Sequence, residues 1–300
     1  MLTSPRLTSI VTGATGGLGL ATAEGLARAG HRVVLTGRDA AKGAAALETL
    51  RRAVPSATAE FRLLDVSSLD AVAAFCAAWS GPVDLLVNNA GVMAYPDRRL
   101  SADGFEMQFA TNYLGHFALT LRLLPALLQA PAPRVVDVSS LAHRTGRIDF
   151  DDLNGERSYS GYRSYGQSKL AMLLFARELQ HRAERRGWKL MSIAAHPGWA
   201  ATSIVANGFG PSLKSQIGNF LFRLAGQSVA DGAKPILFAA LDPTADPALS
   251  YGPANLGETR GPVAPARMMP QATDAAVAAR LFDVSERLTH LSLATAVAEK

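Results

Sequence analysis

The chain has 300 residues, 48% of them hydrophobic and 18% charged, which is typical of a globular protein and excludes an intrinsically disordered one. The net charge is +5, but no aromatic residue separates the arginines of the densest basic stretch, 181–189. That stretch therefore indicates a solvated helix end and no nucleic-acid partner. The single Cys76 excludes an intrachain disulfide and predicts a reducing, cytoplasmic location. No apolar run is long enough to span a membrane, and the N-terminus lacks the apolar core of a signal peptide.

Short segments typical of strands alternate along the chain with longer Ala- and Leu-rich segments typical of helices. The expected strands are 9–14, 32–37, 59–66, 84–90, 134–140 and 189–196, with a weaker seventh at 249–254. The expected helices lie near 18–29, 40–53, 68–79, 102–129, 164–186, 229–241 and 272–288. This alternation predicts an α/β fold: a doubly wound (Rossmann) parallel sheet of about seven strands with helices on both faces. No repeat or linker is visible, so we expect a single domain over residues 1–300.

Two stretches interrupt the alternation. Residues 198–226 are rich in glycine and aromatic residues, which indicates a loop with short helices. Residues 253–270 indicate a Pro- and Gly-rich loop at the start of a C-terminal extension, 253–300. Ordinary packing would account for the aromatic residues of the first stretch, but their clustering also favours an apolar substrate pocket; they are Trp199, Phe209, Phe220 and Phe222.

The segment TGATGGLG (12–19) follows the first expected strand and opens the first expected helix. Its glycines, at 13, 16, 17 and 19, let backbone N–H groups approach a ligand, and the helix N-terminus favours a diphosphate. The spacing departs from the usual GxGxxG fingerprint, and a tight turn can use glycines for steric reasons alone. The position directly after the first strand nevertheless favours dinucleotide binding.

The second expected strand ends in LTGRD (35–39), where a dinucleotide-binding fold reads the adenosine ribose. Gly37 leaves room there, and Arg38 offers a planar fork for the extra phosphate of NADP. Asp39 has two interpretations: it binds a ribose hydroxyl, or it caps the next helix. We favour the cap and therefore NADP(H) over NAD(H).

Polar motifs follow the other expected strands: NNAG (88–91), VSS (138–140) and HPG (196–198), while Asn112 and YGQSK (165–169) lie in expected helices. In an open α/β sheet the ligand crevice lies beyond the carboxyl ends of the strands, so these motifs point to one crevice. Together with the glycine segment they resemble the classical short-chain dehydrogenase/reductase family over about residues 8–245. The stretches NYLGHF, VSSLAH and SYGQSKLAM look most like its retinol-dehydrogenase-like branch, although Met172 stands where many members of that branch have Asn.

The resemblance implies an oxidoreductase that transfers a hydride between a nicotinamide and a carbonyl or alcohol of a small, apolar molecule. It implies four catalytic residues: Asn112, Ser140, Tyr165 and Lys169. The implied cofactor site consists of the last two and of Gly13, Thr15, Gly16, Gly17, Leu18, Gly19, Arg38, Asp65, Val66, Asn89, Ala90, Gly91, Pro197, Gly198 and Thr202. It also implies a substrate lid at 199–226, and a homodimer or homotetramer formed through the helices near 102–129 and 164–186.

Two tyrosines precede Lys169 at spacings that place them on one helix face. A carbonyl that gains a hydride needs a proton, and lowering a phenol pKa from 10 to about 7 requires roughly 4 kcal/mol. An ammonium at i+4 and an oxidised nicotinamide would supply it to Tyr165. Tyr162 has the spacing of enoyl reductases, so a C=C reductase is the alternative. Ser164 and Gln167 form a possible capping box that would begin the helix at Tyr165, which favours that residue.

A third hypothesis is a non-catalytic NADP-binding sensor on the same fold. The presence of all four catalytic groups argues against it.

His116 and His143 have no partners at metal-ligand spacing, so we expect structural roles for both and no metal. Ser139 is expected to be structural as well.

Overall fold

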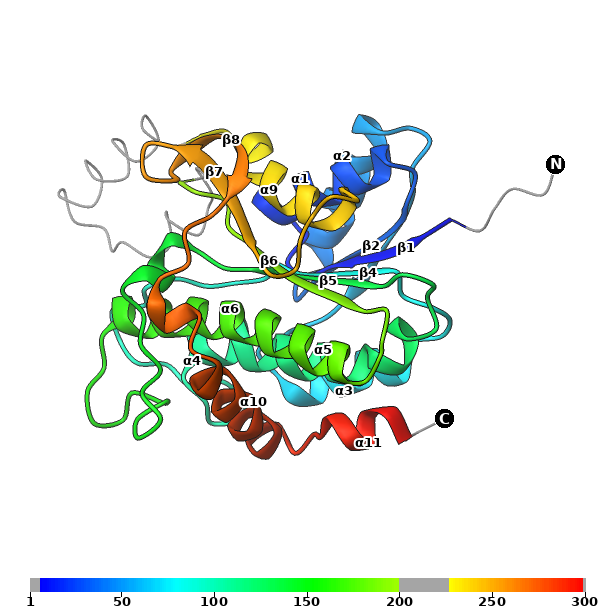
Figure 1. Cartoon of the computed structure of the whole chain (residues 1–300). Coiled ribbons are helices and arrows are strands. Elements are labelled where there is room, and N and C mark those ends of the chain that lie inside the picture. The colour runs from blue at the N-terminus through cyan, green and yellow to red at the C-terminus, as the bar shows by residue number, and fades with distance from the viewer. Residues whose placement is uncertain (1–5, 200–226, 299–300) are drawn as a thin grey trace.

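Eight strands form one sheet in the order β3-β2-β1-β4-β5-β6-β7-β8 (Figure 1). The computed structural model describes residues 6–199 and 227–298. The strands are β1 (Thr8–Val11), β2 (Arg32–Gly37), β3 (Thr58–Leu63), β4 (Leu85–Asn88), β5 (Arg134–Val138), β6 (Met191–Ala195), β7 (Ser250–Asn255) and β8 (Arg260–Pro265). Strands β1 to β7 pair in parallel, and β8 is antiparallel to β7. The strand order reverses between β1 and β4, which confirms the predicted doubly wound fold.

Helices cover both faces of the sheet (Figure 1). One face carries α1 (Gly17–Arg28), α2 (Ala40–Ala53) and α9 (Val229–Leu241); the other carries α3 (Leu69–Ala77), α4 (Met107–Phe109), the π-helix η1 (Ala110–Leu114), α5 (Gly115–Leu127) and α6 (Gly161–Arg185). Neighbouring strand residues therefore enter different cores: Leu86 packs toward α5 and α6, and Val87 toward α1 and α9. This double burial is why the central strands are continuously apolar in sequence.

The two long helices near the site begin at residues other than those predicted. The helix expected from 102 begins at Met107 and passes through a five-residue π-helix before α5. α6 begins at Gly161, so Tyr162 lies in its first turn. The predicted capping box is wrong, because the Gln167 side chain accepts from Asp149 N at 2.9 Å and donates to Leu153 O at 3.1 Å. A long-range contact with the 141–160 segment has replaced the local cap.

The C-terminal part has more regular structure than predicted. Residues 260–265, expected in a loop, form β8, which raises the strand count from about seven to eight. The expected last helix is α10 (Ala275–Thr289), and a further helix, α11 (Leu293–Ala298), follows it. α10 packs on α6 and α11 packs on α5, so the two form an outer layer under that face of the sheet (Figure 1).

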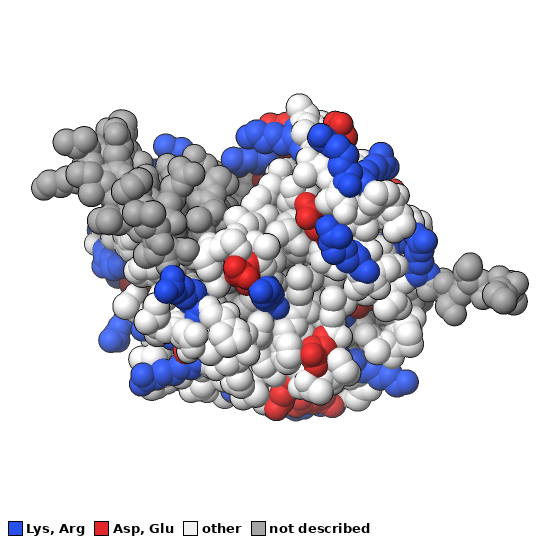
Figure 2. Space-filling view, turned by 90° about the horizontal axis from the view of Figure 1, so that it is seen from above, with Lys and Arg blue, Asp and Glu red and all other residues white. Residues whose placement is uncertain are grey.

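The surface over α1, α2 and α9 is seen in Figure 2. In the described part of this face, Lys and Arg side chains lie mainly near the rim, with acidic side chains among them. None of the described helices combines the length and the apolar character needed to cross a bilayer.

Candidate active site

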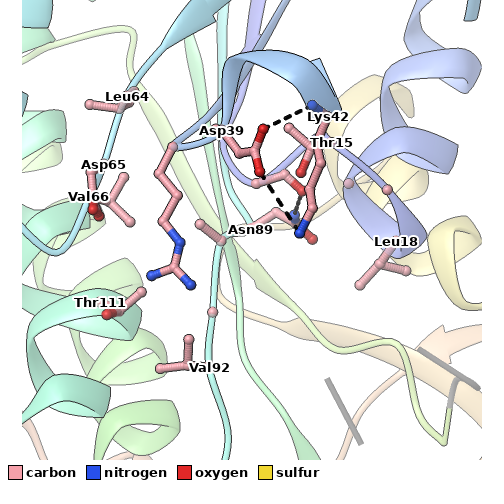
Figure 3. A pocket seen from close by; sticks show the side chains of 18 of the residues that line it. Thr15, Leu18, Asp39, Lys42, Leu64, Asp65, Val66, Asn89, Val92 and Thr111 are labelled. Carbon is pink, nitrogen blue, oxygen red and sulfur yellow. Dashed lines mark hydrogen bonds and ion pairs between the residues drawn. The ribbon is translucent and has the colours of Figure 1, made fainter. Parts of the chain in front are cut away.

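A cleft of about 650 Å³ opens beyond the carboxyl ends of β1, β2 and β4, where the strand order reverses (Figure 3). This is where an open α/β sheet binds ligands. The cleft brings together most of the predicted cofactor residues: Gly13, Thr15, Gly16, Gly17, Leu18, Gly19, Arg38, Asp65, Val66, Asn89, Ala90 and Gly91. Thr202, the aromatic residues Phe209, Phe220 and Phe222, and nearly all of the predicted lid lie outside the described residues.

The glycine segment is shaped to bring backbone close to a ligand. Gly13 has φ +64°, and a Cβ there would lie 2.8 Å from Ala90 Cα. A Cβ on Gly19 would lie 2.4 Å from Gly13 O, so only glycine fits. At Gly16, by contrast, a Cβ would meet no protein atom, and that space belongs to the cleft. Since α1 begins directly after Gly16 with no acidic residue in its first turn, the cradle fits a dinucleotide diphosphate.

The adenosine end of the cleft holds Arg38 and, as a residue that the sequence analysis missed, Lys42. Asp39 Oδ1 accepts from Lys42 N at 3.0 Å, which confirms that Asp39 caps α2 (Figure 3). Asp39 Oδ2 lies 4.0 Å from Lys42 Nζ. The sequence signal for Lys42 is its place in the first turn of the helix that the Asp39 cap begins, directly after Arg38 and Asp39.

A buried network joins the glycine segment to the helix that carries Asn112. Thr12 Oγ1 accepts from Asn89 N at 2.8 Å and Ala90 N at 2.9 Å, and lies 2.9 Å from His116 Nε2. His116 Nδ1 lies 3.1 Å from Asn112 O, which can only accept, so Nδ1 carries the hydrogen and Nε2 accepts from Thr12. Burial lowers the pKa of His116 to about 4, so the ring is neutral at physiological pH. This agrees with the predicted structural role.

Asn112 uses its side chain to fix the loop after β4. Its Oδ1 accepts from Val92 N at 2.8 Å, and its Nδ2 donates to Val92 O and to Ser168 Oγ, both at 2.9 Å. A Cβ on Gly91 would lie 3.2 Å from Asn112 Oδ1 and 3.5 Å from Lys169 Nζ. Gly91 therefore marks the place where the cleft reaches the amide and the ammonium.

The other catalytic candidates meet beside this point. Tyr165, half-buried on α6, hydrogen-bonds the Ser140 side chain, and its ring centre lies 6.0 Å from Lys169 Nζ. Lys169 Nζ donates to Val138 O at 2.9 Å. Ser139 instead donates to Lys169 O at 2.7 Å, a structural bond of the kind expected for it. A phenol, a hydroxyl and an amine thus lie together at the carboxyl end of β5.

Burial sets the protonation states of the phenol and the amine in the protein by itself. Burial raises the pKa of Tyr165, and the hydrogen bond from Ser140 only partly opposes this. Burial also lowers the pKa of Lys169 to about 8, while the charge of Asp137 acts to raise it. The lowered Tyr165 pKa expected from the sequence depends on the oxidised nicotinamide as well as on the Lys169 ammonium, so it stays a prediction. The phenol is a proton donor at neutral pH.

Tyr162 does not reach this centre. Its side chain is 63% exposed in the first turn of α6. Tyr159 packs in the preceding segment, where its hydroxyl donates to Tyr95 O at 3.0 Å. His143 Nδ1 donates to Ser140 O at 2.7 Å, which supports a structural role for this histidine too.

The remaining predicted cofactor residues, Pro197 and Gly198, lie in the turn after β6 and are not among the lining residues of this cleft. Gly198 has φ +63°, and its N–H donates to His196 Nδ1 at 3.2 Å. Pro197 O accepts from the Gln227 side chain at 2.6 Å. Among the described residues no cluster of His, Cys, Asp and Glu could hold a metal ion.

Known proteins are similar to this chain in sequence. The family model described as short chain dehydrogenase matches residues 8–209. Polyprenol dehydrogenase of Mus musculus is 42% identical over 246 residues, 80% of this chain and 72% of that protein. Retinol dehydrogenase 14 of Homo sapiens is 37% identical over 302 residues, 95% of this chain and 86% of that protein.

Solved structures are similar to this chain in fold as well. An uncharacterised protein from Mycobacterium paratuberculosis has a TM-score of 0.78 at 39% identity, covering 96% of this chain and 95% of that one. A short-chain dehydrogenase/reductase from Burkholderia phymatum, in complex with NAD, has a TM-score of 0.61 at 25% identity, covering 80% and 87%. An actinorhodin polyketide ketoreductase with NADPH has 0.63 at 26%, covering 83% and 95%. The chain therefore belongs to the short-chain dehydrogenase/reductase family, in its retinol-dehydrogenase-like branch, and is an NAD(P)-dependent oxidoreductase that acts on CH–OH and C=O groups.

Proposed function

We propose that the protein reduces an apolar aldehyde or ketone with NADPH, and oxidises the corresponding alcohol in reverse. The observation that carries this proposal is that the Tyr165 ring, the Lys169 amine and Ser140 lie together at the carboxyl end of β5, next to the dinucleotide cleft. The apolar substrate is supported by relatives whose names specify retinol and polyprenol.

Ser140, Tyr165 and Lys169 have different roles in the reduction. NADPH, when bound, supplies the hydride that adds to the carbonyl carbon. Ser140 donates a hydrogen bond to the substrate oxygen, and Tyr165 gives its proton to that oxygen as it gains negative charge. A phenol with a raised pKa suits this direction, because it holds its proton at neutral pH. Lys169, near Gly91, adds positive charge beside the phenolate that remains.

The preference for NADPH is supported by two cations at the adenosine end, Arg38 and Lys42, which line the same cleft. Asp39, the only acidic residue at the end of β2, is engaged as the α2 cap. A carboxylate held in a cap competes less for a ribose hydroxyl, and an Arg–Lys pair suits a phosphate.

The decisive experiment is a panel of aldehydes, ketones and enones tested with NADPH and NADH for wild type and Tyr165→Phe. We expect wild type to form alcohols with NADPH. We expect Tyr165→Phe to lose turnover by at least about 100-fold, in line with the loss of a general acid, while it still binds NADPH. Near-normal turnover of this variant would refute the assignment. A saturated ketone formed from an enone would instead indicate C=C reduction, which the exposed Tyr162 does not favour.

A further inference from the structure

The tip of the β7–β8 hairpin holds three consecutive residues in the left-handed region: Leu256 (φ +50°), Gly257 (+68°) and Glu258 (+68°). Residues with a Cβ rarely adopt this conformation, because the Cβ approaches the carbonyl oxygen. Strained residues persist where the surrounding contacts fix them, and they are concentrated at functional sites. The contacts that hold Glu258 in this strained conformation therefore bear on the role of this residue.

The Glu258 carboxylate is only 15% exposed and makes one ion pair and two hydrogen bonds. Oε2 lies 2.8 Å from Arg144 Nη2 in the ion pair and accepts from His196 Nε2 at 3.0 Å. The latter assignment follows from Gly198 N, which donates to His196 Nδ1 and leaves the ring hydrogen on Nε2. Oε1 accepts from Arg267 N at 2.9 Å.

These bonds reach two different parts of the active site. Arg144 ends the short helical turn η2 (Leu141–Arg144) that directly follows Ser140, and its Nη1 also donates to Gly257 O at 3.2 Å. His196 opens the turn to Pro197 and Gly198.

The hairpin touches that second turn directly as well. A Cβ on Gly198 would lie 2.4 Å from Thr259 O, and this oxygen accepts from Trp199 N at 2.8 Å. Gly252 is also fitted to this network, since a Cβ there would lie 2.2 Å from His196 Nε2. The backbone of β7 thus leaves room for the imidazole that binds Glu258.

We propose that Glu258 is a positioning residue for the reaction. From a hairpin that contributes no catalytic group, its carboxylate joins the turn that carries Ser140 to the turn that carries Gly198. It thereby fixes the distance between the Ser140 hydroxyl, which orients the substrate oxygen, and the Gly198 backbone at the nicotinamide end of the cleft. The inference rests on the proposed function, in which these two turns contact substrate and cofactor.

A residue that only stabilised the fold would give different measurements. Loss of such a residue lowers the unfolding temperature but leaves the kcat of the folded enzyme unchanged. Loss of a positioning contact lowers kcat of the folded enzyme, because small displacements of reacting groups slow the chemical step strongly. It also changes the environment of the nicotinamide, which the emission of bound NADPH reports without any turnover.

The test compares Glu258→Gln, Glu258→Gly and the matched control Glu48→Gln, a carboxylate of the exposed pair with Arg52 on α2. Gln keeps the shape and removes the charge. Gly removes the carboxylate and relieves the left-handed backbone, so it guards against misfolding. For both Glu258 variants we expect kcat to fall about 10-fold or more, with an altered emission of bound NADPH and unchanged affinity for 2′,5′-ADP, which occupies only the adenosine end.

Arg144→Gln, alone and combined with Glu258→Gln, tests the route. If Glu258 acts through Arg144, the double variant loses much less than the product of the two single losses. Folded Glu258 variants with a kcat and NADPH emission within twofold of wild type would overturn the proposal. If wild type itself turned over no carbonyl, the proposed function would fail, and the emission of bound NADPH would still decide for or against the positioning role.

Discussion

Asp137 is a buried carboxyl group whose charge interacts with that of Lys169. Its Oδ1 accepts from Asn88 Nδ2 at 2.8 Å, and its Oδ2 has no protein partner. Burial raises its pKa to about 7, against the opposing effects of Asn88 and the Lys169 charge. Lys169 and Asp137 thus each hold their charge weakly at neutral pH, which leaves the centre sensitive to small electrostatic changes such as cofactor binding.

The raised pKa of Asp137 predicts a pH-dependent cost to stability. The folded state favours the protonated acid. The contribution of Asp137 to the free energy of unfolding is therefore fully present below about pH 4 and is lost as pH rises toward about 7. Asp137→Asn removes this loss. We expect the unfolding free energy of the variant, measured with urea and relative to wild type, to rise between pH 4 and pH 7.

Histidines that titrate in this range, such as His116, are present in both proteins and cancel in the difference. The control is Asp97→Asn, which changes an exposed carboxylate. A difference between Asp137→Asn and wild type that stays constant over this pH range would show that the fold does not raise the Asp137 pKa.

Arg38 and Lys42 give a prediction about the cofactor. If both contact the 2′-phosphate, Arg38→Ala and Lys42→Ala should each weaken NADPH binding about 10-fold or more, since a charge-assisted hydrogen bond contributes about 1.5–3 kcal/mol. NADH binding should change little. Fluorescence titration measures both affinities, with Arg52→Ala as a control on the outer part of α2. Tighter binding of NADH than of NADPH by wild type would contradict the assignment.

At the scale of elements, the sequence predicted best where local chemistry decides the structure. The bounds of α2 and α9 came out as expected, because Asp39 and Ser228 cap them locally. The start of α6 was wrong because Gln167 binds the 141–160 segment, a contact that no local pattern reveals. β8 was missed because its two prolines and one glycine indicate a loop, although as an edge strand it tolerates them.

In the candidate site too, the sequence predicted the local motifs and missed the residues whose partners are distant in sequence. The glycine segment and the Tyr165–Lys169 pair were visible as motifs. Glu258 and Asp137 were not, since their partners lie 62 and 49 residues away in sequence. The burial that raises the Tyr165 pKa in the protein by itself was not visible either, because the spacing of residues does not encode burial.

The contact between α10 and α6 gives a prediction about stability. Phe282 is 1% exposed and lies 5.0 Å from Phe117 and 6.0 Å from Phe175 between ring centres. Phe282→Ala should lower the unfolding free energy by about 3–5 kcal/mol, as for other buried aromatic residues. Denaturant unfolding measures this, with the exposed Arg287→Ala on the same helix as the control. A loss below about 1 kcal/mol would mean that α10 is not firmly docked.

At the scale of the whole molecule, α10 and α11 cover the faces of α5 and α6 through which the family resemblance implies a homodimer or homotetramer. Tyr113 on η1 hydrogen-bonds Ser285 at 2.7 Å, and the Arg182 guanidinium lies 3.9 Å from the Phe282 ring centre. Nearly all of α6 between Ser164 and Leu179 is buried within one chain. We therefore expect that a homodimer of the full chain, if it forms, uses another surface.

This arrangement predicts what removal of the two helices does. A chain ending at Thr273 exposes the apolar side chains of α5 and α6 that Phe282 now covers, and such a patch drives association. We expect the shortened chain to dimerise or aggregate, and the full chain to show no association through this face. Light scattering after size exclusion compares each mass with the 31.6 kDa of one full chain. A shortened chain that stayed monomeric and folded would mean that these faces need no cover, and that α10 and α11 are dispensable to the architecture.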